Sequence, residues 1–249
     1  MALSVIVITH NEADAIRDCL ASVEWADEIV VVDSGSSDAT VAICREFTDK
    51  VVARQWPGFG PQKNYALSLA TGEWVLSIDA DERVPVELRA DIEAALRDPA
   101  GRHAFRVPRL SSFCGRFMQH GGWRPDHVTR LFLRGRARFS DDLVHERLIV
   151  DGEIGTLPHS LLHLSYVDLE EVLDKLNRYS TSGAEMLARR GENSSLLRAI
   201  LHGGWAFLRT YFLRAGFLDG REGFMLAVTN AETTYYRYLK LMLLGAGKR

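Results

Sequence analysis

The first hundred residues alternate short apolar runs with amphipathic segments. The apolar runs are rich in β-branched residues and too short for helices, so they predict buried strands. Strands that alternate with helices predict an α/β fold with a mostly parallel sheet flanked by helices. We expect strands at Leu3–Thr9, Glu28–Asp33, 50–54 and 74–78, and helices after Asn11 and over 39–47, 61–70 and 85–96.

After residue 98 the pattern changes to shorter apolar runs separated by turns. Runs at 105–109, 129–133 and 143–150 predict short strands that add a mixed edge to the sheet. The segment 113–126, which contains Trp123 and three glycines, lies between the first two runs. It is either a functional loop over a binding site or an irregular connection, and the sequence leaves both interpretations open.

The C-terminal third has the period of amphipathic helices. Helices are expected over 168–190, after a cap at Ser194 or Ser195, and over 223–244. We therefore predict two domains, 1–165 with the sheet and 166–249 as a C-terminal helical appendage. In the middle helix, one side holds Leu197, Ile200, Leu201, Leu208, Tyr211 and Phe212, and another side holds Arg198, His202 and Arg209.

The formal net charge of −3 is divided unevenly along the chain. Residues 189–249 hold ten Lys and Arg against four Asp and Glu, so they carry +6 and the remainder carries −9. A basic tail on an acidic body predicts an anionic partner, either nucleic acid or a lipid surface. Because the tail is rich in Leu rather than dense in Lys, we expect a membrane surface and no nucleic acid.

The end of the last predicted helix combines aromatic and basic residues. Tyr235, Tyr236, Arg237, Tyr238 and Lys240 crowd together there, which is typical of side chains at headgroup depth. A helical appendage packed on the body or on a second subunit explains the same residues equally well. Whether the tail forms a homo-oligomer therefore stays open.

Length and composition favour a folded, intracellular protein. With 249 residues and 47% hydrophobic content, the chain can bury a core as one large domain, or as one domain with an appendage. Its three widely spaced cysteines fit neither a disulfide framework nor a zinc site, which favours a reducing cytoplasm. The start lacks a basic leader, and no uncharged run reaches the ~18 residues that a spanning helix needs.

Polar clusters follow three of the predicted strands. They are His10-Asn11-Glu12, Asp33-Ser34-Gly35 and Asp79-Ala80-Asp81. Parallel sheets bind ligands beyond the carboxyl ends of their strands, so three clusters on one rim predict a nucleotide pocket. Asp79 and Asp81 suit a divalent metal that carries phosphates, although Asp81 or Glu82 would also cap the next helix. Neither a Gly-x-Gly-x-x-Gly turn nor a Gly-rich Lys-Ser/Thr loop is present in the sequence.

Four segments in series resemble glycosyltransferase family 2. They are residues 4–12 (SVIVITHNE), 31–40 (VVDSGSSDAT), 62–67 (QKNYAL) and 77–82 (SIDADE). The resemblance implies a GT-A, Rossmann-like nucleotide-sugar fold, a UDP-sugar donor, Mg²⁺ or Mn²⁺, and inversion at the anomeric carbon. The Val144-His145-Glu146 region and the basic tail are further similar to bacterial lipopolysaccharide core enzymes that add β-1,4-glucose to inner-core heptose.

The resemblance also implies roles for individual residues. Thr9, Asn11 and Glu12 would face the uridine and ribose. Asp33 would contact uracil, because its carboxylate can accept a hydrogen bond from the imide N–H of that base. The alternative is that Asp33 only forms a turn. Lys63 would lie near the donor. Asp79 would approach ribose or metal, Asp81 would be the principal metal ligand, and Glu82 would be structural.

An inverting transfer also needs a base that takes the proton of the acceptor hydroxyl. We assign it to Glu146, with Asp142 second; an acid paired with Arg147 or Arg130 is the structural alternative. His145 would bind metal or diphosphate, or be a hydrogen-bonded core residue. Arg130 is assigned to the diphosphate or to acceptor phosphates, and Trp123 to the acceptor.

The sequence thus predicts a metal-dependent inverting glycosyltransferase that moves a hexose, in the first place glucose, from a UDP-sugar to a lipid-linked saccharide such as inner-core heptose. We expect it to be peripheral on the cytoplasmic face of the inner membrane. The alternatives are transfer to polyprenyl phosphate and a non-catalytic nucleotide-sugar-binding membrane scaffold.

Overall fold

The computed structural model describes residues 1–140 and 146–246. Contacts divide the chain into two compact units, Met1–Arg109 with Asp126–His163 and Leu110–Pro125 with Leu164–Arg249. The segment Leu110–Pro125, which the sequence placed in the first predicted domain, groups with the C-terminal helices.

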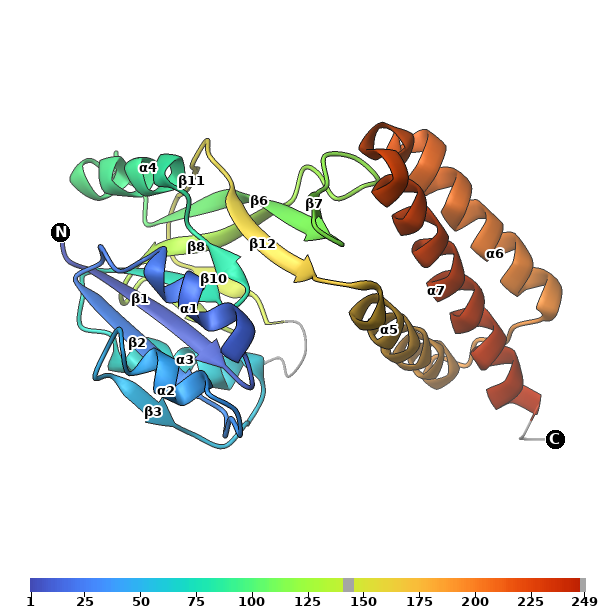
Figure 1. Cartoon of the computed structure of the whole chain (residues 1–249), viewed down its shortest axis with the longest axis horizontal. Coiled ribbons are helices and arrows are strands. Elements are labelled where there is room, and N and C mark those ends of the chain that lie inside the picture. The colour runs from blue at the N-terminus through green and yellow to red at the C-terminus, as the bar shows by residue number, and fades with distance from the viewer. Residues whose placement is uncertain (141–145, 247–249) are drawn as a thin grey trace. The chain divides into compact units, whose positions relative to one another are not determined.

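The first unit is built on a parallel sheet (Figure 1). Its strands are parallel, as the chain pattern predicted, and they lie in the order β3-β2-β1-β4. Both faces of β1, β2 and β4 are covered, so their apolar runs are almost continuously buried. The α/β fold is confirmed. The strands are β1 (Leu3–Thr9), β2 (Glu28–Asp33), β3 (Val51–Ala53) and β4 (Trp74–Asp79).

Helices cover the two faces of this sheet. Ile16 of α1 (Ala13–Ala21) and Leu88 of α4 (Val86–Arg97) belong to one core cluster, and Ala66 of α3 (Phe59–Leu69) belongs to a second. The alternating side chains of β1 divide between the two clusters, as the pleat of a strand requires. The helix α2 (Thr40–Cys44) is shorter than predicted, because β-branched residues in its short sequence lower its helix propensity.

Beyond β4 the sheet continues as β8-β6-β12-β5, and β8 is antiparallel to both β4 and β6. This is the predicted mixed edge, although the sequence did not indicate β12. Residues 143–145 of the predicted strand 143–150 lie outside the described part of the chain. The added strands are β5 (Glu82–Arg83), β6 (Ala104–Phe113), β8 (His127–Leu133), β11 (Ile154–Thr156) and β12 (Leu161–Tyr166). The strands β9 (Ala137–Phe139) and β10 (Leu148–Val150) pair with each other in a separate two-stranded sheet.

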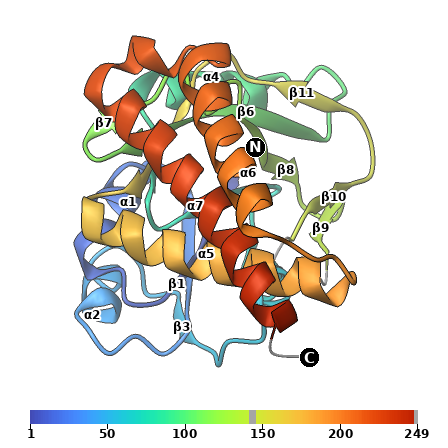
Figure 2. The same cartoon turned by 90° about the vertical axis from the view of Figure 1, so that its right-hand side faces the viewer.

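The second unit is mainly helical, and its α6 and α7 lie side by side (Figure 2). Asp168 caps α5 by accepting from Glu171 N at 2.9 Å, and Ser195 caps α6 by accepting from Arg198 N at 3.2 Å. No helix among the described residues is long and apolar enough to cross a membrane. The elements are β7 (Arg116–Phe117), α5 (Leu169–Arg189), α6 (Leu196–Leu208), the π-helical turn η1 (Arg209–Leu213), the 3-10 turn η2 (Gly216–Asp219) and α7 (Gly220–Ala246).

Candidate active site

The carboxyl ends of β1, β2 and β4 bring the predicted polar clusters to one rim of the sheet. In the strand register Thr9 lies opposite Asp33, and Ile8 lies opposite Asp79. The clusters that follow these residues therefore leave the sheet at the same edge, where a parallel sheet binds its ligands.

Hydrogen bonds join the turns that follow β1 and β2. Asn11 has a left-handed φ of 54°, which Asn adopts more readily than most residues. Its Oδ1 accepts from Ser37 N at 2.8 Å, and its own N–H donates to Ser36 Oγ at 2.8 Å. The N–H of Glu12 donates to Thr40 Oγ1 at 2.8 Å. These bonds fix the shape of the rim, while the uridine and ribose contacts of Asn11 and Glu12 stay predictions.

Asp33 is 2% exposed and holds its own turn together. One carboxylate oxygen accepts from the N–H groups of Gly35 and Ser36, both at 2.9 Å, and the other accepts from the Ser36 hydroxyl. This geometry is the turn-forming role that the sequence offered as the alternative. The contact of Asp33 with uracil stays a prediction.

Two side-chain oxygens near this rim, Thr9 Oγ1 and Gln62 Oε1, are buried without a hydrogen-bond partner in the described parts of the chain. The Gln62 amide donates to Ser34 Oγ at 3.1 Å, which places it beside the turn after β2. A buried polar group without a partner costs about 1–3 kcal/mol. The rim therefore has unused capacity to accept hydrogen bonds from a ligand.

The acidic cluster after β4 is tied together by Arg130, which is 6% exposed. The Arg130 guanidinium donates to Asp79 at 2.5 Å and to Glu82 at 2.6 Å, and Glu82 also accepts from Asp79 N at 3.0 Å. Lys63 Nζ lies 3.0 Å from the other oxygen of Asp79. Arg130 was predicted to bind phosphate, but here two carboxylates already neutralise its charge, and a phosphate role stays a prediction.

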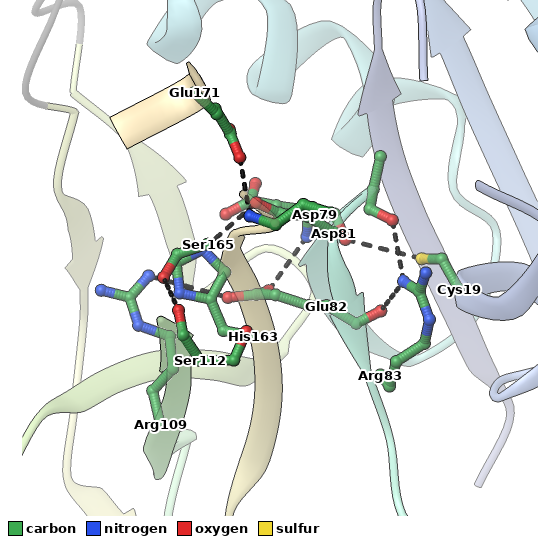
Figure 3. A network of polar contacts seen from close by, with 12 residues as sticks. Cys19, Asp79, Asp81, Glu82, Arg83, Arg109, Ser112, His163, Ser165 and Glu171 are labelled. Atoms are coloured by element: carbon green, nitrogen blue, oxygen red, sulfur yellow. Dashed lines mark hydrogen bonds and ion pairs between the residues drawn. The ribbon is translucent and has the colours of Figure 1, made fainter. Parts of the chain in front are cut away.

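The alternative that Asp81 or Glu82 caps the next helix is wrong. The helix α4 begins after Pro85, and no side chain caps it. Glu82 is instead 0% exposed within β5, where it accepts from Arg130. It also lies 3.8 Å from Arg109 (Figure 3). Its role is structural, as predicted.

The two acids on Arg130 differ in their pKa. Burial would raise the pKa of Asp79, but the charges of Arg130 and Lys63 outweigh burial and hold that pKa well below its usual range. Burial raises the pKa of Glu82 despite Arg130, and the negative charge of Asp79 adds to the rise. Asp79 is therefore the permanently charged member of the cluster.

Asp81 points to a different partner, His163 of β12. Its Oδ2 lies 3.2 Å from His163 Nε2, and the antiparallel register places His163 opposite Glu82 (Figure 3). A carboxylate oxygen beside an imidazole nitrogen, each partly exposed, fits one side of a divalent cation site, and the imidazole favours Mn²⁺ over Mg²⁺. Among the described residues no cluster of three such groups completes a site, so a ligand or water would supply the remaining positions.

The predicted base, Glu146, lines a cavity of about 370 Å³ beside this cluster. Its Oε1 lies 2.8 Å from Lys63 Nζ, so Lys63 bridges Glu146 and Asp79. Its partner is thus Lys63, and not Arg147 or Arg130 as the structural alternative proposed. The cavity is lined by Lys63, Asp79, Arg109, Val128, Thr129, Arg130, Phe139, Glu146, Arg147 and Leu148.

This rim agrees with comparisons to known proteins. The family model for Glycosyl transferase family 2 matches residues 4–134, more than half of the chain. The chain belongs to glycosyl transferase family 2. The lipopolysaccharide core biosynthesis glycosyltransferase LpsC of Rhizobium meliloti is 31% identical over 97% of this chain and 92% of its own length. An uncharacterized glycosyltransferase of Rickettsia felis is 31% identical over 96% of this chain and 89% of its own.

Solved structures extend the family assignment to the fold. Residues 1–349 of S. aureus TarS match with a TM-score of 0.51 and 16% identity, covering 100% of this chain and 92% of theirs. The same part of TarS in complex with UDP-GlcNAc matches with a TM-score of 0.50 and 17% identity. This family 2 glycosyltransferase therefore has the GT-A fold that its sequence motifs implied.

Three predicted site residues of this glycosyltransferase are not placed at the rim. Asp142 and His145 lie outside the described residues, and nothing is assigned to them. Trp123 belongs to the second unit, where its ring packs 6.0 Å from Phe113 and 5.9 Å from Tyr166. Its contact with the acceptor stays a prediction.

Sequence reasoning missed two residues of the cluster, His163 and Arg109. Both come from strands of the mixed edge, and Arg109 also lies 2.8 Å from Asp126. The run Leu161–Tyr166 carries a short apolar pattern that could have indicated β12. No motif marks either residue, because their partners in the cluster lie far away in the sequence.

Proposed function

We propose that this family 2 glycosyltransferase transfers a hexose, in the first place glucose, from a UDP-sugar with inversion at the anomeric carbon. The acceptor is a lipid-linked saccharide such as the inner-core heptose of lipopolysaccharide. The single observation that carries the proposal is the cavity in which Glu146, Lys63 and Asp79 meet beside the carboxyl rim of the sheet. It combines a carboxylate that can accept a proton with a cation that can meet a diphosphate.

The donor part of the proposal rests on the rim. The free acceptor atoms Thr9 Oγ1 and Gln62 Oε1 suit the N–H of a uracil and the hydroxyls of a ribose. Asn11 and Glu12 border the same turn, and Asp33 stabilises it from within. TarS, which shares the fold, has been solved with UDP-GlcNAc.

In the proposed reaction Glu146 takes the proton of the acceptor hydroxyl as its oxygen bonds to the anomeric carbon. The bond from that carbon to the diphosphate breaks on the opposite face, and UDP leaves with the electron pair. Lys63 stabilises the negative charge that develops on the diphosphate. When bound, Mg²⁺ or Mn²⁺ would neutralise the same charge, and Asp81 and His163 would hold it, with Asp79 close by.

The acceptor class is supported by LpsC, a lipopolysaccharide core enzyme that is similar along almost the whole chain. We place the reaction at the cytoplasmic face of the inner membrane, where a lipid-linked saccharide meets a nucleotide sugar. The choice of glucose and of the acceptor position is tested with a panel of UDP-sugars and truncated lipopolysaccharides, with the product analysed by mass and linkage.

Glu146→Gln tests the assignment of the base. We expect transfer to fall by roughly 10²–10⁴-fold, because general bases contribute about that factor. UDP-sugar affinity in calorimetry should not fall, because the substitution removes a carboxylate charge that would compete with the donor for Lys63. Glu153→Gln, at an exposed acid of the same unit, is the matched control and should transfer normally. Near-normal transfer by Glu146→Gln would refute the assignment, and donor binding without turnover by the wild type would favour a non-catalytic scaffold.

A further inference from the structure

The helix α6 is built with its small side chains inward. Its buried positions are Ala199, Gly203 and Ala206, and Thr210 of η1 continues this row. A Cβ atom at Gly203 would lie 3.0 Å from Tyr235 Cβ of α7, so the two helices pack closely there. The side of α6 that faces its neighbour therefore offers almost no large apolar surface.

The large apolar side chains of α6 and η1 point to solvent instead. Leu197, Leu201 and Trp205 are 65%, 62% and 53% exposed, and Phe212 and Leu213 are 55% and 68% exposed. We call these five residues the apolar face. A surface helix of a soluble domain normally has the opposite pattern, with its large apolar residues toward the core. An exposed patch of this kind marks an interaction surface.

The charged residues of the segment that carries the apolar face have one sign, although Arg198 is paired with Glu192 at 3.1 Å. Residues 193–218 contain three arginines and neither Asp nor Glu. Arg209 and Arg214 are exposed. Asp219, the next acid along the chain, is 1% exposed and accepts from the N–H groups of Gln119 and His120, so its charge is not presented at the surface. The partner of the apolar face is therefore apolar and anionic.

Half-exposed aromatic rings gather where α6 ends. Tyr211 lies 5.1 Å from Phe212, 6.2 Å from Phe217 and 5.6 Å from Phe224. Phe212, Phe217 and Phe224 are each about half exposed. Aromatic rings beside arginines are typical of segments that lie at the boundary between lipid headgroups and acyl chains.

We propose that the apolar face docks on a lipid bilayer that contains anionic phospholipids. A second copy of this chain is the weaker occupant, because a two-fold contact through this face would bring together two copies of a segment that carries arginines and neither Asp nor Glu. The 13 residues of α6 span about 20 Å, less than the ~30 Å of a hydrocarbon core, so the helix would lie in the interface and not cross it. This inference does not depend on which sugar is transferred.

Sedimentation of the full chain with vesicles, without donor or acceptor, tests the proposal. We expect binding to phosphatidylethanolamine vesicles that contain phosphatidylglycerol, and weaker binding without phosphatidylglycerol or at high salt. The double substitution Leu201→Glu/Trp205→Glu should weaken binding on the order of tenfold or more, and Arg209→Glu should weaken it for the anionic vesicles. Val86→Glu, at a 73% exposed apolar residue of the first unit, is the matched control and should bind normally.

Three results would overturn the proposal. The wild type could fail to bind vesicles, the control Val86→Glu could lose as much binding as the double variant, or the double variant could bind normally. Light scattering distinguishes the alternative in which a second copy covers the apolar face. In that case the wild type would be a dimer, the Leu201→Glu/Trp205→Glu variant would be a monomer, and neither would bind vesicles. Circular dichroism confirms that each variant is folded. Glycosyl transfer to a soluble acceptor fragment, measured separately, should be unchanged in the double variant, so failure of docking and failure of the proposed chemistry are distinguishable.

Discussion

Replacing Arg130 with Met decides whether this arginine holds the acidic cluster together or binds phosphate. The substitution keeps most of the side-chain volume and removes the charge that joins Asp79 and Glu82 at 2.5 and 2.6 Å. Because the Glu82 side chain is 0% exposed, its carboxylate would be left in the core with only the N–H of Asp79 at 3.0 Å and Arg109 at 3.8 Å. Breaking a buried ion pair in this way costs about 3–5 kcal/mol. For a chain of this size we expect the melting temperature to fall by roughly 10 °C.

The pH dependence of Arg130→Met follows from the pKa of Glu82. Burial already raises that pKa, and loss of the arginine raises it further. A group whose pKa is raised by folding adds stability below its unfolded pKa and loses it as the pH rises through the folded pKa. The variant should therefore recover stability as the pH is lowered from 8 toward 5. Adding Glu82→Gln removes the titrating group, so the double variant should melt higher than Arg130→Met at pH 8 and lose this pH dependence.

The assay is thermal melting of wild type, Arg130→Met, Glu82→Gln and the double variant, followed by circular dichroism at several pH values. Arg136→Met is the matched control, because its arginine is 51% exposed and its Asp151 partner 78% exposed. Exposed pairs contribute little, so its melting temperature should stay within about 2 °C of the wild type. An Arg130→Met protein that melts like the control and binds its acceptor more weakly would refute the structural role and favour phosphate binding.

The other predictions concern metal binding, acid stability and helix packing. Asp81→Asn and His163→Gln should each weaken Mn²⁺ binding in the presence of UDP by roughly tenfold or more, measured from free Mn²⁺ by electron paramagnetic resonance; unchanged binding would exclude both as ligands. Burial would raise the pKa of Glu28, but hydrogen bonds from one lysine and two hydroxyls outweigh it and lower that pKa to about 2. Glu28→Gln should therefore lower the free energy of unfolding by about 2–3 kcal/mol at neutral pH. That difference should disappear as the pH falls from about 4.5 toward 2, and a constant difference would contradict it. Gly203→Ala should destabilise the protein, because its new Cβ would lie 3.0 Å from Tyr235 Cβ. At Gly204 a new Cβ meets nothing within 4 Å, so Gly204→Ala should stabilise α6 by about 0.5–1 kcal/mol. Equal effects of the two substitutions on the melting temperature would contradict this packing.

The rim of the sheet could be predicted from the sequence because its residues follow strand ends. Asp33 and Asp79 directly follow apolar runs and Asn11 follows one after two residues, and a parallel sheet binds its ligands at the carboxyl ends of its strands. The pattern thus gave the position of the site and the order of its clusters.

The partners within the cluster could not be predicted in the same way. Arg130 meets Glu82 across 48 positions of sequence, and His163 meets Asp81 only because β12 pairs with β5. Such contacts depend on the register of the mixed edge, which the short apolar runs do not specify. The apolar stripe of α6 was likewise visible in the sequence. Its outward direction follows from the close approach of α7 at Gly203, and neither helix propensity nor the hydrophobic period predicts that approach.

Lys63 links the two halves of the proposed reaction. Its side chain is 5% exposed, and its ammonium bridges Asp79 at 3.0 Å and Glu146 at 2.8 Å. In the proposed reaction a UDP-sugar would bring a further anion to this cavity, and its phosphates would compete with both carboxylates for the charge of Lys63. Asp79 keeps Arg130 as a second cationic partner, so the loss of Lys63 leaves it paired. In the proposed reaction Glu146 would therefore be the carboxylate whose pairing with Lys63 weakens, and it would then accept the proton of the acceptor hydroxyl. Donor binding would thus prepare the proposed base before the acceptor arrives, which links the order of binding to a contact between two side chains.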